Sequence, residues 1–133
     1  MKLSLFGAIA LGFATVVTVV PVSAHHSFSA EYDSKKVVTL TGTVTKVEWM
    51  NPHVYFYLDV TGTDGKVANW AFEMGPPNGL QRSGWTRNTM KIGDEVIVNG
   101  TLAKDGSKQV NARTVTTSDG KKLGAASSEG TGN

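Results

Sequence analysis

Hydrophobic and polar residues alternate strictly from residue 53 to residue 60, which predicts a half-buried β-strand. The face expected to lie in the core carries Val54, Phe56, Leu58 and Val60. The opposite face carries His53, Tyr55, Tyr57 and Asp59. Polar groups interleaved with aromatic rings are typical of surfaces that hold a ligand, so this second face is a candidate site.

Four further strands are predicted, separated by turns rich in Gly, Asp and Pro. Their expected ranges are 37–49, 66–74, a strand after the turn at 92–94, and 109–117. In the first of them the apolar phase changes after Val44, and Gly42 stands where the strand can bend. A short helix is expected at 78–83.

Three strands, a short helix and two more strands form the order of the OB-fold, a five-stranded Greek-key barrel. An up-and-down meander has the same number of strands. The bent first strand and the helical connector favour the all-β, OB-like barrel, because small barrels close through long, bent strands. We assign the barrel domain to residues 37–123, an extended N-terminal arm pinned by Phe28 and Tyr32 to 25–36, and a disordered polar tail to 124–133.

Residues 1–24 have the pattern of a secretory signal peptide: Lys2, an uncharged apolar run, and the small-residue exit Val22-Ser23-Ala24. A membrane anchor is the alternative, since 18 apolar or small residues just reach across a bilayer. Cleavage after Ala24 is favoured, and the mature chain would begin at His25. A bacterial periplasmic location fits best, with full secretion left open, and no membrane span would then remain.

Composition restricts the partners of the mature chain. Loss of Lys2 with the leader reduces the 13 basic residues to 12, against 11 acidic ones. A nearly neutral exported domain is a poor ligand for nucleic acid, which proteins bind through clustered positive charge. The chain has no cysteine, so disulfides and thiolate metal sites are excluded.

Several motifs follow one another along the mature chain: His25-His26-Ser27-Phe28, Glu48-Trp49 with Asn51-Pro52-His53, Tyr57-Leu58-Asp59-Val60, Asn69-Trp70-Ala71-Phe72-Glu73 and Gly84-Trp85-Thr86-Arg87. Together they resemble a bacterial family of short exported proteins of unknown function. The resemblance extends from residue 25 to about residue 123. It supports the compartment and the single domain, and it implies no activity.

The three histidines of the chain, His25, His26 and His53, are the candidate metal ligands. After cleavage, the α-amine and imidazole of His25 would form a chelate, and His53 would add a third nitrogen. Such a nitrogen set suits Cu(II), so a copper ion is the candidate cofactor. His26 can replace His25 in this set. The competing interpretation is a solvated terminus and a purely structural His53.

Tyr55, Tyr57 and Asp59, with Trp85, are the candidate residues for a small ligand, although cross-strand packing also explains the tyrosines. Trp49, Trp70 and Phe72 are expected in the core. Glu48 and Glu73 are expected to approach each other on adjacent strands, where paired carboxylates can do acid–base work. No complete catalytic motif is present, which makes an enzyme the less favoured class.

The sequence therefore favours an exported binding module for a metal ion or small ligand. A non-catalytic accessory protein that contacts another envelope protein is the first alternative. A copper-dependent redox enzyme is the second.

Overall fold

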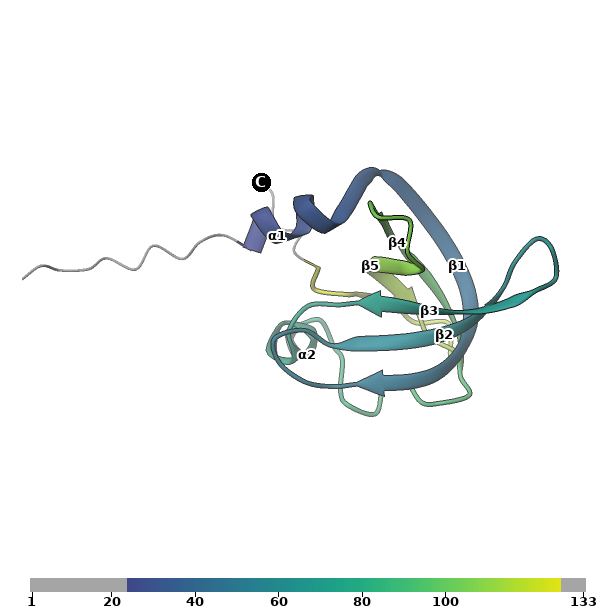
Figure 1. The fold of residues 1–133 in the computed structure, drawn as a ribbon. Helices are drawn as coiled ribbons and strands as arrows, with labels where there is room; N and C mark the ends of the chain where they lie inside the picture. Colours follow the sequence, from purple (N-terminus) through teal and green to yellow (C-terminus); the bar gives the residue numbers. More distant parts are fainter. Residues whose placement is uncertain (1–23, 128–133) are drawn as a thin grey trace, which may run out of the picture.

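The chain folds around one strongly curved sheet, and the computed structural model describes residues 24–127 (Figure 1). The elements are, in order, α1 (Ala24–Glu31), β1 (Tyr32–Glu48), β2 (Tyr55–Thr61), β3 (Val67–Glu73), α2 (Pro77–Arg82), β4 (Glu95–Ala103), β5 (Gln109–Thr116) and β6 (Lys122–Gly124). The mostly β class and the short helix between the third and fourth strands agree with the sequence prediction.

The strand pairings close into a circuit. The sheet order is β3-β2-β1-β4-β5-β6, and β3 also pairs with β5. This last pairing is parallel and short, joining Ala71–Glu73 to Gln109–Asn111, whereas the other pairings are antiparallel. Residues 24–127 form six strands and not the predicted five. The sixth spans only three residues, too few to show an alternating pattern.

The bend predicted in the first strand is present, and it has two local causes. The register of β1 against β2 shifts between Val44 and Lys46, as in a β-bulge. At Gly42, an added Cβ would lie 2.6 Å from the carbonyl oxygen of Asp59. The backbone of β2 therefore approaches β1 at this residue too closely for any side chain to fit. The change of apolar phase in the sequence is the trace of this bulge.

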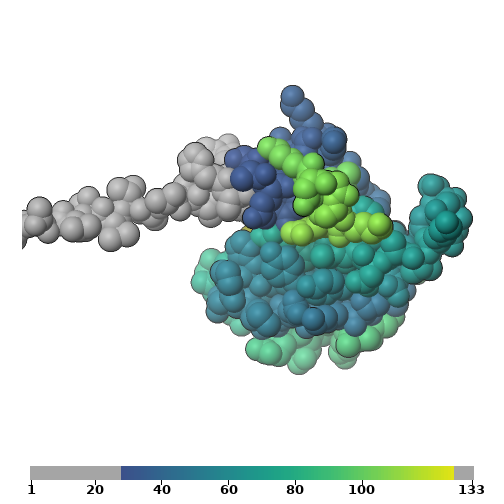
Figure 2. All heavy atoms as spheres, in the orientation of Figure 1, coloured from purple at the N-terminus to yellow at the C-terminus, as the bar shows by residue number. Residues whose placement is uncertain are grey.

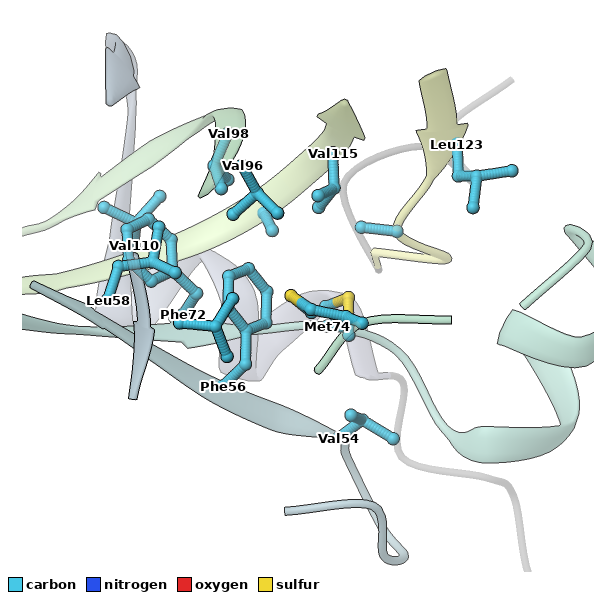
Figure 3. Packing of buried hydrophobic residues seen from close by; sticks show 14 of the residues in the cluster. Val54, Phe56, Leu58, Phe72, Met74, Val96, Val98, Val110, Val115 and Leu123 are labelled. Carbon is cyan, nitrogen blue, oxygen red and sulfur yellow. The ribbon is translucent and has the colours of Figure 1, made fainter. Parts of the chain in front are cut away.

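The core lies inside the curved sheet, and Figure 3 shows side chains from several strands meeting there. The four predicted core residues of β2 and its approach, Val54, Phe56, Leu58 and Val60, are all buried. Phe56 and Phe72 stack with their ring centroids 4.9 Å apart. Trp49 and Trp70 are only half-buried and pack against the outside of this cluster.

The N-terminal segment differs from the extended arm that was predicted. Residues 24–31 form helix α1, and β1 begins directly at Tyr32. Phe28 stacks on Tyr32 at 5.5 Å between ring centroids, the i, i+4 contact that a helical turn permits. The short helix carries too few apolar residues for its period to be visible in the sequence.

The C-terminal segment is packed as far as it is described. Ala125 is fully buried, and its carbonyl oxygen accepts a 2.8 Å hydrogen bond from the Gly75 amide. Ser127 donates a 2.6 Å hydrogen bond to the side-chain oxygen of Asn111. Residues 124–127 thus differ from the predicted disordered tail, and residues 128–133 lie outside the described range.

The stacked phenylalanines generate a stability prediction. Phe72→Ala should lower the free energy of unfolding by about 3–5 kcal/mol, because it removes a fully buried ring and leaves a cavity. Val67→Ala is the matched control, since Val67 lies on the same strand and is 62% exposed. Its change should stay within about 0.5 kcal/mol in urea unfolding. Similar losses in the two variants would contradict this account of the core.

Candidate functional site

His53 stands at the entry to β2, where two backbone hydrogen bonds fasten the chain to the end of β3. The Val54 amide donates to the Gly75 carbonyl at 3.1 Å, and the Met74 amide donates to the Val54 carbonyl at 2.8 Å. The His53 side chain is 36% exposed, and its Nδ1 forms a short hydrogen bond with Oε1 of Glu73. The imidazole is therefore held from one side and open on another.

Glu73 is a buried carboxyl group at the end of β3, only 6% exposed. Its Oε2 accepts a 2.5 Å hydrogen bond from the hydroxyl of Tyr32. The amide of Gln109 donates to the same hydroxyl oxygen at 2.7 Å. A continuous chain of hydrogen bonds thus connects β5, the start of β1, β3 and His53. No buried side-chain nitrogen or oxygen in the described part of the chain lacks a partner.

A small polar pocket of about 130 Å³ opens beside this chain. Its lining residues come from α1, β1, β2 and its approach, β3 and β5, and they are Phe28, Glu31, Tyr32, His53, Tyr55, Glu73 and Asn111. None of them is Lys or Arg. Helix α1 forms one wall, so the N-terminal segment lies next to His53.

Helix α1 is held at its C-terminal end by Lys104, which follows β4. The Lys104 amide donates to the Glu31 carbonyl at 2.8 Å, and the ammonium donates to the Ser29 carbonyl. Figure 2 shows the first coloured residues lying against the green turn between β4 and β5. These contacts fix the wall that α1 contributes to the pocket.

Burial is the main reason that both tyrosines of the pocket stay protonated. Burial, together with the hydrogen bond to Glu73, raises the pKa of Tyr32 well above its ordinary value of 10.0. Burial and then the charge of Glu73 raise the pKa of Tyr55 in the same direction. Both hydroxyls therefore remain hydrogen-bond donors through the physiological range.

The residues predicted to hold a ligand do not lie together. Tyr55 lines the pocket beside His53. Tyr57 instead donates a 3.1 Å hydrogen bond to Glu48, and Asp59 accepts one of 2.9 Å from Asn69, both on the outer face of the sheet. Their cross-strand contacts agree with the packing interpretation of these side chains.

Trp85 is placed in the core and not in the pocket. It is 2% exposed, and its indole N–H donates a 2.8 Å hydrogen bond to the Gly124 carbonyl. The expected pairing of Glu48 with Glu73 is also absent. The strand register places Tyr55 between them, opposite Glu48 on β1 and opposite Glu73 on β3. The two carboxyl groups thus have different partners.

The candidate metal ligands are only partly described. His25 and His26 belong to α1, but their side chains lie outside the described residues. Among the described side chains, no group of three or more His, Cys, Asp or Glu residues is arranged to hold a metal ion. The described side chains thus do not by themselves form a metal site of three such ligands at His53.

Sequence reasoning missed most partners of His53. Tyr32, Gln109 and Asn111 are separated from it by 21, 56 and 58 positions, and only the closure of the sheet brings them together. One signal was available. Glu73 lies on the polar face of β3, and the neighbouring strand β2 carries Tyr55 on the same face. A polar contact between these two side chains was therefore to be expected where the two strands end.

A family model matches residues 14–112, well over half of the chain. The chain belongs to the family of unknown function DUF6152. No curated protein matches it. Within residues 24–127, no helix has the length and apolar character needed to cross a membrane.

The hydrogen bond between Tyr32 and Glu73 generates a prediction on stability and pH. Tyr32→Phe should lower the free energy of unfolding by about 1–3 kcal/mol near neutrality, because a buried carboxyl oxygen loses its donor. Tyr57→Phe is the control, since its bond to Glu48 is only partly buried, and it should cost less.

The same tyrosine should also make the wild type lose stability at alkaline pH. Below pH 10 Tyr32 is protonated in both states, so its contribution is complete. Above that pH the unfolded chain releases the proton while the folded chain retains it, and the free energy of unfolding falls as pH rises. Urea unfolding across this range should show a shallower fall in Tyr32→Phe. An unchanged slope would exclude Tyr32 as a source of the alkaline loss.

Proposed function

We propose that the chain is an exported binding module that holds a copper-type metal ion at His53, together with the mature N-terminus. The observation that carries the proposal is the placement of α1. Phe28 and Glu31 of this helix line the same pocket as His53, and His25 lies one helical turn before Phe28. The N-terminal segment, which the sequence alone left unplaced, is thus beside the third histidine.

The scaffold that we propose is an OB-like barrel. Its support is the pairing circuit β1-β2-β3-β5-β4, with α2 between β3 and β4. In this interpretation β6 is an addition to the five-stranded ring. OB-folds carry many unrelated ligands, so the fold itself leaves the ligand open.

Export to the periplasm is part of the proposal and rests on the leader pattern of residues 1–24. Cleavage after Ala24 would free the α-amine of His25. That amine and its own imidazole would then supply two nitrogens, and His53 would supply the third. Residues 1–23 lie outside the described range, so this step depends on the sequence pattern.

The environment of His53 supports a ligand role over a purely structural one. Its ring is partly exposed in a pocket, while a buried carboxyl group engages Nδ1. Histidines that bind metals generally have their second ring nitrogen hydrogen-bonded in this way. The pocket also contains two carboxyl groups and no Lys or Arg, which favours a cation.

The deciding experiment is a Cu(II) titration followed by EPR, on protein that begins at His25. We expect tight one-to-one binding and an EPR signal of nitrogen coordination. The matched control carries one additional glycine before His25, which moves the α-amine away from the imidazole. Affinity should drop sharply in this control and in His53→Ala, checked to be folded by its thermal transition.

Equal affinity in the three proteins would contradict the metal site. An envelope protein as partner would then become the favoured alternative. Capture from envelope extract, compared between the wild type and a variant of a half-buried residue on the outer face of the sheet such as Tyr57, would be the next measurement.

A further inference from the structure

We infer that Glu73 is a positioning residue, which holds the proton of neutral His53 on Nδ1 and leaves Nε2 as the atom that binds the ligand. Sequence reasoning assigned neither this role to Glu73 nor a binding atom to His53. The ligand class that follows is a cation or another electron-pair acceptor, and this part rests on the proposed function. The position of the proton does not depend on it.

Gln109 sets the direction of the hydrogen-bond chain. Its Nε2 is an amide nitrogen and can only donate, so the Tyr32 oxygen accepts this 2.7 Å bond. The single proton of the Tyr32 hydroxyl is then directed to Oε2 of Glu73, 2.5 Å away. Glu73 is therefore an acceptor at this oxygen.

The other oxygen of Glu73, Oε1, contacts His53. In its ionised form Glu73 has only acceptor positions, so the short contact with His53 then has Nδ1 as the donor. Burial strengthens the requirement, because an ionised carboxylate that is 6% exposed needs donors on both oxygens. Tyr32 donates to one oxygen of Glu73, and His53 donates to the other.

The second ring nitrogen of His53 is thereby left with a lone pair. Nε2 makes no hydrogen bond to any of the residues that the structure describes. A lone pair on this nitrogen binds a metal cation or accepts a hydrogen bond, and it repels an anion. The absence of Lys and Arg from the pocket lining points in the same direction.

The test measures the imidazole tautomer by long-range ¹H–¹⁵N NMR on metal-free protein that carries the additional N-terminal glycine. The spectra are recorded over a pH range, because neutral and charged rings have distinct nitrogen shifts. We expect the neutral ring of His53 to have its proton on Nδ1 in the wild type. In Glu73→Gln the single tautomer should be replaced by a mixture, since an amide can both donate and accept.

Glu48→Gln is the matched control. Glu48 lies in the same cross-strand row but bonds to Lys46 and Tyr57 and not to His53. The tautomer of His53 should be unchanged in this variant. A wild-type ring protonated on Nε2, or equal spectra in the two Gln variants, would overturn the inference.

The same variants separate this inference from the proposed function. On protein that begins at His25, Glu73→Gln should weaken Cu(II) binding about 10–100-fold, and Glu48→Gln should leave it unchanged. If copper does not bind but the proton is on Nδ1, the positioning role stands and the metal proposal fails. If inorganic phosphate binds in place of copper, the cation assignment fails.

Discussion

The buried carboxyl group of Glu73 is the constraint on which the arrangement of the pocket depends. A carboxylate removed from water is strongly destabilising unless donors surround it. Here the donors come from two separate segments, Tyr32 at the start of β1 and His53 before β2. Gln109 of β5 supports the first of them. One carboxyl group therefore ties together the ends of strands that are distant in sequence.

Tyr32 has a second role, because it also connects the buried part of the site to α1. Its hydroxyl contacts Glu73 while its ring stacks against Phe28. The helix is fastened further along by Lys104. Tyr32 thus supports both the α1 wall of the pocket and the buried carboxyl group of Glu73. Through these contacts α1 and His53 are held together.

The strands were largely predictable, and the site was not. The alternation around Phe56 and Leu58 predicted a core face, and both side chains are fully buried. The phase change after Val44 predicted the bulge. The sequence did not predict the position of Trp85, whose indole N–H donates a hydrogen bond to the Gly124 carbonyl. The reason is that a connector has no regular alternation, so the sequence does not show whether an aromatic side chain in it points to the core or to the solvent.

Local alternation and composition were enough to locate the five longer strands, the core face of β2 and the small set of histidines. The contacts of Glu73 with His53 and Tyr32, and its separation from Glu48, arise only when the strands assemble into the sheet. Closing the circuit through β3 and β5 set the neighbours of each strand end. Such neighbours are fixed by the register of strands far apart in the chain, and no local pattern records that register.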